Sequence, residues 1–228
     1  MKSLQALLMV VLIAGLADPA RAWFTQPIAD DARTDAGLMR VGGGITVESD
    51  VHLYGARFTY GLVQDLAVFI GGGVVDDDLM GSEPFAQIGG LYQLPLADLP
   101  FDLAVRAAFG IADTFENDYS SLRRRHKEEL DVWMLNVGLL GSKAIDALTV
   151  YGLVGLSYQR YRVKETITQF DSMAARRLYT RRSSYSDDET ELAVAAGLLV
   201  TATERISFYG ELAHIDELFT SLGIQYQF

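Results

Sequence analysis

The 228-residue sequence contains no cysteine and only four lysines, Lys2, Lys127, Lys143 and Lys164. The absence of cysteine excludes a disulfide framework, thiol chemistry and a lipid anchor attached through cysteine. Soluble β-proteins use lysine freely on outward faces and edges, so its absence from the middle of the strand candidates favours lipid outside. With 30 acidic residues against 19 basic ones, the formal net charge of −11 argues against nucleic acid as the main partner.

The sequence also lacks a helix-length apolar run after residue 22. Before that point, Lys2, the apolar run Leu4–Leu16 and the small-x-small site Ala20-Arg21-Ala22 predict a secretory signal peptide over 1–22, because the run is too short for a membrane-spanning helix. Residues 23–36, which contain Pro27 and several aspartates, are predicted to form a flexible periplasmic leader. A chain of this kind crosses a membrane only as a closed barrel.

The remainder of the chain alternates apolar residues with small or polar ones at a period of two, which predicts strands. The second face is mainly glycine, alanine and serine, which suits a narrow, filled lumen. We therefore predict an all-β fold over residues 37–228. It is a closed antiparallel transmembrane β-barrel of about ten strands in up-and-down order, with eight as the alternative number. The predicted strands are 37–48, 51–60, 64–75, 84–94, 101–112, 130–142, 147–163, 190–202, 205–214 and 218–228.

The connections between these strands alternate in length. With the C-terminus in the periplasm, the periplasmic turns are all short, and the two long connections, 113–129 and 164–189, fall outside the cell. Short inner turns and long outer loops are typical of outer-membrane barrels. A secreted soluble barrel or sandwich is the alternative, because its strands alternate in the same way.

The last segment, Leu218–Phe228, has one apolar face that ends in Tyr226 and Phe228. This segment resembles the closing strand of bacterial outer-membrane β-barrel proteins, in which a C-terminal Phe is the assembly signal. The resemblance implies an outer-membrane location and recognition of Tyr226 and Phe228 by the barrel assembly machinery. We expect a monomer in contact with outer-membrane lipid.

Most of the positive charge lies in and beside the two long outer connections. Because arginine pairs well with phosphate, these residues are candidates for contact with lipopolysaccharide or another polyanion. The alternative is a pair of solvated loops, since acidic residues are interspersed. The candidate ligand-binding residues are Arg123, Arg124, Arg125, Lys127, Arg176, Arg177, Arg181 and Arg182.

Three charged residues are predicted to point into the lumen at mid-height: Arg57, Arg106 and Glu211. Opposite charges in a narrow space pair with each other, so one interpretation is an ion cluster that plugs the barrel. The other is the constriction of a narrow passive channel for small solutes. Small barrels are usually filled by side chains, which favours the plug.

An enzymatic alternative rests on polar residues near the outer rim. Asp76 and Asp78 follow the third predicted strand, and His214 and Asp216 follow the ninth. The omptin proteases are ten-stranded outer-membrane barrels with paired aspartates and a His–Asp couple at the rim, and this set resembles theirs, although the couple appears here in reversed order. No other catalytic motif, metal site or cofactor site is predicted. The predicted function is therefore that of a non-enzymatic surface barrel, with the channel and the omptin-like protease as alternatives.

Overall fold

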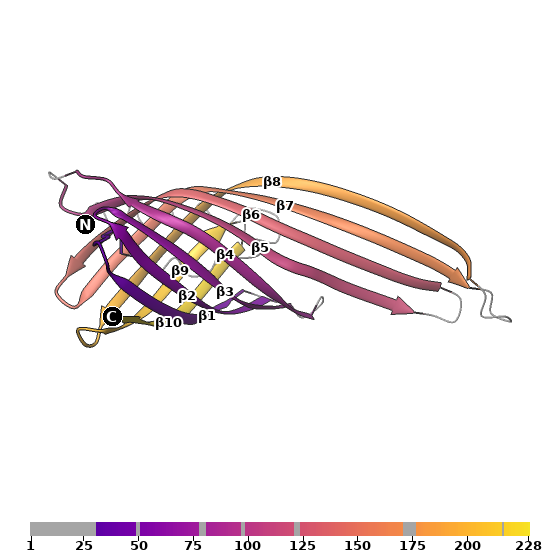
Figure 1. The fold of residues 1–228 in the computed structure, drawn as a ribbon, viewed down its shortest axis with the longest axis horizontal. Helices are drawn as coiled ribbons and strands as arrows, with labels where there is room; N and C mark the ends of the chain where they lie inside the picture. Colours follow the sequence, from indigo (N-terminus) through magenta and orange to yellow (C-terminus); the bar gives the residue numbers. More distant parts are fainter. Residues whose placement is uncertain are drawn as a thin grey trace.

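A computed structural model describes residues 31–48, 51–77, 81–96, 99–120, 124–170, 177–215 and 217–228. Ten strands form one closed antiparallel barrel in which each strand pairs with its neighbours in sequence and β1 pairs with β10 (Figure 1). No helix within these ranges is long and apolar enough to cross a membrane. The strands are β1 (Met39–Val47), β2 (Val51–Val63), β3 (Leu66–Asp77), β4 (Gly81–Gln93), β5 (Asp102–Ser120), β6 (Arg124–Ile145), β7 (Leu148–Phe170), β8 (Arg177–Thr201), β9 (Ile206–Ile215) and β10 (Glu217–Gln227).

The predicted alternation of faces is confirmed in the closing strand. Leu218 and Leu222 are 61% and 64% exposed on the outside of the barrel, whereas Phe219, Ser221 and Gln225 are buried in its interior. A strand places successive side chains on opposite faces, so a one-residue slip of β10 against β1 or β9 would turn its apolar face into the lumen. The prediction of a closed ten-stranded barrel in meander order is likewise confirmed.

The outside of the barrel is a belt of apolar side chains. Large aliphatic residues stand exposed on the strands all the way round the barrel, among them Ile45, Ile70, Ile88, Leu139, Val154, Leu198, Leu212 and Ile224. Exposed apolar surface on this scale is unfavourable in water but matches the hydrocarbon core of a bilayer. The exterior therefore fits lipid.

The interior is filled by large side chains set against glycines on neighbouring strands. A Cβ atom added at Gly197 would meet the Tyr151 ring, and one added at Gly89 would meet the Phe69 ring. Gly44 and Gly223 in the same way leave room for the phenol of Tyr209. The glycine-rich inner face thus makes space for aromatic rings in a barrel of small diameter.

The two ends of the barrel differ greatly. The first and last described residues, Asp31 and Phe228, and the short turns lie at one end, and at the other end β5, β6, β7 and β8 continue together far beyond the remaining strands (Figure 1). β5 pairs with β4 only as far as Ala112, and β8 pairs with β9 only from Val194 onward. The predicted strand ends at 112, 130, 163 and 190 are wrong, because cross-strand hydrogen bonding extends β5 to residue 120, starts β6 at 124, extends β7 to 170 and starts β8 at 177. These extensions form a four-stranded sheet, the projecting sheet.

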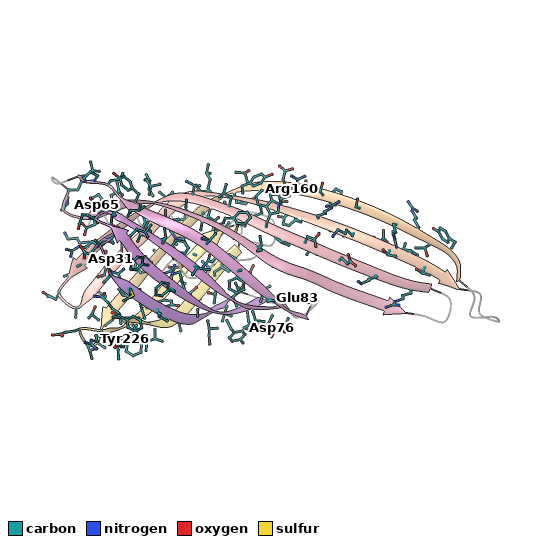
Figure 2. All side chains as sticks on the ribbon, in the orientation of Figure 1. Asp31, Asp65, Asp76, Glu83, Arg160 and Tyr226 are labelled. Carbon is teal, nitrogen blue, oxygen red and sulfur yellow. The ribbon has the colours of Figure 1, made fainter. Side chains whose placement is uncertain are left out.

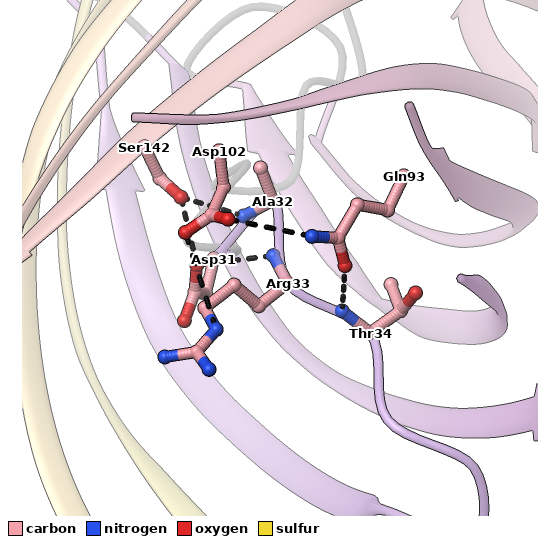
Figure 3. A network of polar contacts seen from close by, with 7 residues as sticks. All are labelled: Asp31, Ala32, Arg33, Thr34, Gln93, Asp102 and Ser142. Carbon is pink, nitrogen blue, oxygen red and sulfur yellow. Dashed lines mark hydrogen bonds and ion pairs between the residues drawn. The ribbon is translucent and has the colours of Figure 1, made fainter. Parts of the chain in front are cut away.

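Part of the segment predicted as a flexible leader lies inside the mouth of the barrel at the end with the short turns. Ala32 and Thr34 are buried inside the mouth. The Ala32 amide donates to Ser142 Oγ (2.9 Å), which donates to Asp31 Oδ1 (2.7 Å), and the Thr34 amide donates to Gln93 Oε1 (3.1 Å) (Figure 3). Residues 31–34 of the predicted leader therefore contact the barrel wall, whereas the predicted signal peptide lies outside the described residues.

Candidate functional site: the projecting sheet

The projecting sheet inherits its two faces from the barrel. The pairings of β6 with β7 and of β7 with β8 run without a register shift from the barrel wall to the tip of β6, apart from one irregularity near Phe170. Alternation therefore continues unbroken into the projecting sheet. Residues in phase with the lipid-facing positions of the same strand form an outward face, and residues in phase with the lumen-facing positions form an inward face.

The outward face is rich in positive charge. Among the side chains that the structure describes on β6, β7 and β8, six cations and three anions share this face. They are Arg125, Lys127, Arg160, Arg162, Lys164 and Arg182, with Glu129, Asp131 and Asp188. Lys127 lies 2.7 Å from Glu129 and Lys164 lies 2.7 Å from Asp131. The hydrogen bond from Lys127 lowers the pKa of the Glu129 carboxyl, which therefore stays ionised.

The inward face has the opposite balance. Its described charged side chains are four acids and one base: Glu165, Asp187, Glu189, Glu191 and Arg181. Here Tyr161 donates to Glu189, and Ser183 donates to Glu165 (2.9 Å). The sheet therefore separates charge, with cations turned toward the lipid side and acids turned toward the space above the lumen.

A groove of about 510 Å³ lies where the outward face leaves the barrel. It is lined by Asp131, Trp133, Arg160, Arg162, Ser184, Tyr185 and Ser186. Directly beneath it, Trp133 contacts Phe109 and Tyr158, with ring centroids 5.9 and 5.3 Å apart. Figure 2 shows Arg160 at the base of the projecting sheet, on the outside of the molecule.

The three charged residues predicted for the lumen all lie there, buried. Arg57 and Arg106 both approach the Phe69 ring, with guanidinium carbons 5.3 and 4.9 Å from its centroid. Glu211 accepts a hydrogen bond from the Tyr151 hydroxyl (2.9 Å). Sequence reasoning identified the charges but missed Phe69 and Tyr151, the aromatic residues that hold them.

The structure does not bring together Asp76 and His214, the two described residues of the enzymatic alternative. Asp76 on β3 and His214 on β9 lie on strands separated by β10, β1 and β2, and burial alternation places both side chains on the outside of the barrel. Asp76 accepts a hydrogen bond from Ser82 on β4 (2.5 Å). Two side chains that both point away from the mouth cannot position one water molecule between them.

The remaining predicted site residues fall outside what the structure describes. Asp78, Arg123, Arg176 and Asp216 are not among the described residues, and Arg124 and Arg177 are placed only as positions in β6 and β8. Among the described residues, no group of three or more histidine, aspartate or glutamate side chains is arranged to hold a metal ion. The described part of the candidate site is therefore the projecting sheet, with its cationic outward face and its acidic inward face.

The sequence predictions of basic residues did not include Arg160 and Arg162 among the ligand candidates, although both line the groove. The signal that marks them is the spacing Arg160-x-Arg162-x-Lys164, which puts three cations on one face of a strand. Arg160 and Arg162 lie inside the predicted strand 147–163, so the sequence alone could have placed both on one face, and only Lys164 fell in the segment expected to be a connection.

No family model and no curated protein matches the sequence. Solved β-barrels with low identity are similar in fold. The outer membrane protease OmpT from Escherichia coli is 13% identical, with a TM-score of 0.48 over 85% of this chain and 94% of that one. The N-terminal β-barrel domain of Pseudomonas aeruginosa OprF is 14% identical, with a TM-score of 0.39 over 85% and 98%. The Yersinia pestis attachment invasion protein Ail, solved with the heparin analogue sucrose octasulfate, is 14% identical, with a TM-score of 0.38 over 85% and 99%.

Proposed function

We propose that the protein is a monomeric, non-enzymatic outer-membrane surface barrel whose projecting sheet contacts lipopolysaccharide or another surface polyanion. The observation that carries this proposal is the concentration of cations on one face of a sheet that extends from the outer end of a lipid-facing barrel. Arginine and lysine on a hydrogen-bonded sheet are held in fixed positions, so they meet a polyanion with less loss of conformational freedom than on a loop.

The barrel itself supports an anchoring role over a channel. Phe69, Leu91, Leu140 and Phe219 are nearly fully buried inside it, and Ala32 closes the end that holds the termini. A solute path requires a continuous water-filled lumen, and these side chains occupy the position where it would run. The barrel then serves to hold the sheet at the membrane surface.

The closing strand supports recognition by the barrel assembly machinery. Phe228 is 64% exposed on the lipid side, and its amide donates to the Met39 carbonyl of β1 (3.0 Å). The Tyr226 and Phe228 rings meet edge to face at a centroid distance of 4.9 Å. The residues proposed as the assembly signal therefore lie at the seam that closes the barrel.

Polyanion binding is tested with heparin and with purified lipopolysaccharide, using Arg182→Gln and Arg181→Gln as a matched pair on the two faces and a double variant on the outward face. Arg182 and Arg181 are adjacent and exposed on β8, but they lie on the outward and the inward face. Lys127→Gln together with Arg182→Gln should weaken binding several-fold, and Arg181→Gln should change it little. The loss should be larger at low salt, where the Debye length is ~30 Å at 0.01 M.

Replacement of Asp76 and His214 should leave polyanion binding unchanged. We also expect no peptide cleavage that depends on these residues, because they lie on the outside of the barrel on strands that are not neighbours. Peptide cleavage that disappears in His214→Ala would contradict the proposal. Equal weakening by Arg181→Gln and Arg182→Gln would contradict the assignment of binding to one face.

A further inference from the structure

The groove at the base of the outward face has the position of a lipid headgroup site. Three successive cross-strand pairs of β6 and β7 lead up to it: Leu135 with Tyr158, Trp133 with Arg160, and Asp131 with Arg162. The face thus changes from apolar to aromatic to cationic within a few residues. Aromatic rings mark the boundary between hydrocarbon and headgroups, so Arg160 and Arg162 lie at headgroup level.

The two arginines are available for a ligand. Asp131, the acid that lines the groove, is engaged by Lys164 at 2.7 Å. Within the described part of the chain, neither Arg160 nor Arg162 has a hydrogen-bond or ion-pair partner, and both are exposed. Asp188 lies across from Arg160 and Asp131 across from Arg162, so this part of the face carries both signs of charge. A phosphate bound between Arg160 and Arg162 would lower the mutual repulsion of the two guanidinium groups.

The remaining lining supplies the other contacts that a phosphorylated lipid needs. Ser184 and Ser186 offer hydroxyl donors from β8, directly across from Lys164 and Arg162. Trp133 offers an apolar surface that continues into the lipid-facing belt. The groove, at about 510 Å³, is large enough for a phosphorylated sugar headgroup but not for a folded partner.

We propose that this groove holds a phosphate group of an outer-leaflet lipid of the protein's own membrane, of the kind that lipid A carries, with Arg160 and Arg162 as its ligands. The guanidinium forks donate charge-assisted hydrogen bonds to the phosphate oxygens, and Trp133 packs against the apolar part of the same lipid. This inference rests on the proposed function and narrows it to one ligand, one face and two residues.

A lipid of the same membrane fits better than a polyanion on another surface, because the groove opens on the face that continues the lipid-facing wall. The inward face, which is turned away from the surrounding lipid, is acidic and would repel phosphate. The cationic outward face is therefore turned toward the phosphates of the outer leaflet, and the acidic inward face is turned away from them.

The test uses full-length protein carrying Trp23→Phe, so that Trp133 is the single tryptophan and its emission reports on the groove. The protein is placed in phosphatidylcholine nanodiscs and titrated with diphosphoryl lipid A or with lipid A from which both phosphates have been removed. We expect saturable binding of the diphosphoryl form. The double variant Arg160→Gln, Arg162→Gln should raise its Kd about tenfold or more, as expected for lost charge-assisted contacts.

Arg181→Gln is the matched control and should keep the Kd within about twofold, because it removes one exposed arginine from the inward face. Dephosphorylated lipid A should bind weakly to every variant. Unchanged lipid A affinity in the double variant, with heparin binding retained, would overturn the groove assignment and leave the proposed function standing. Binding of neither lipid A nor heparin by the parent protein would overturn both.

Discussion

At the scale of single residues, the barrel is held by pairs in which one member is large because the other is glycine. The Tyr151 ring lies where a side chain at Gly197 would be, and its hydroxyl reaches Glu211 across the strand. The Phe69 ring lies over Gly89 and meets two arginines. The same aromatic rings that pack against these glycines therefore also contact the buried charges of the lumen.

Gly197→Ala should destabilise the barrel by about 1–3 kcal/mol, because the added methyl group forces the Tyr151 ring from its place in a filled interior. Gly141→Ala is the matched control, since a Cβ there meets its nearest atoms at ordinary distances of 3.9 and 4.0 Å. Urea unfolding of both variants in lipid vesicles measures the difference. Equal free energies of unfolding for the two variants would show that the lumen is loosely packed.

Sequence reasoning reached some of these residues and not others, for a physical reason. The side on which Arg57, Arg106 and Glu211 lie follows from alternation within a strand, which is local. Their partners Phe69 and Tyr151 come from other strands, and which of them meet depends on strand tilt and register around the closed barrel. Contacts across a lumen are therefore set by the closed sheet and not by any one segment.

At the scale of elements, the ten strands could be predicted but the length of four of them could not. In the barrel wall, strict alternation of apolar and small residues marks each strand. In the projecting sheet both faces are wet and polar, so segments such as 177–189 carry no apolar period and look like loops. Cross-strand hydrogen bonds with neighbouring long strands determine their structure instead.

The two faces of β10 give a prediction for this scale. Leu222 is exposed on the lipid-facing side of β10, so Leu222→Arg places a charge in the bilayer. Near the midplane this should lower the free energy of unfolding by about 2–4 kcal/mol. Gln225→Arg should cost less, because that residue points inward and lines a cavity of about 120 Å³ at the end of the barrel. Unfolding titrations in vesicles compare the two. A larger loss for Gln225→Arg would mean that the faces are reversed.

At the scale of the whole molecule, the closed barrel, the partly filled inner mouth and the projecting sheet with its two oppositely charged faces are consistent with one orientation in the membrane. The apolar belt sets the depth of the barrel in the bilayer, and the Phe109–Trp133–Tyr158 group marks the outer surface. Ala32 and Thr34 are buried in the mouth at the opposite end (Figure 3). The projecting sheet is the part that a barrel of uniform strand length would lack, and it carries the residues of the proposed function.

A filled lumen predicts that the protein conducts poorly. In a planar bilayer we expect wild-type protein to give no large, steady conductance, because the rings of Phe69, Tyr151 and Tyr209 and the buried leader residues stand in the solute path. The joint replacement of Phe69 and Tyr151 by alanine removes two of these rings. It should raise the conductance of the fraction that still folds, and heat-modified mobility on gels measures that fraction separately.

The Arg160→Gln, Arg162→Gln variant is the control and should conduct no more than wild type, since those residues lie outside the lumen. Large wild-type conductance would instead favour a channel, and the surface proposal would then have to explain an open pore.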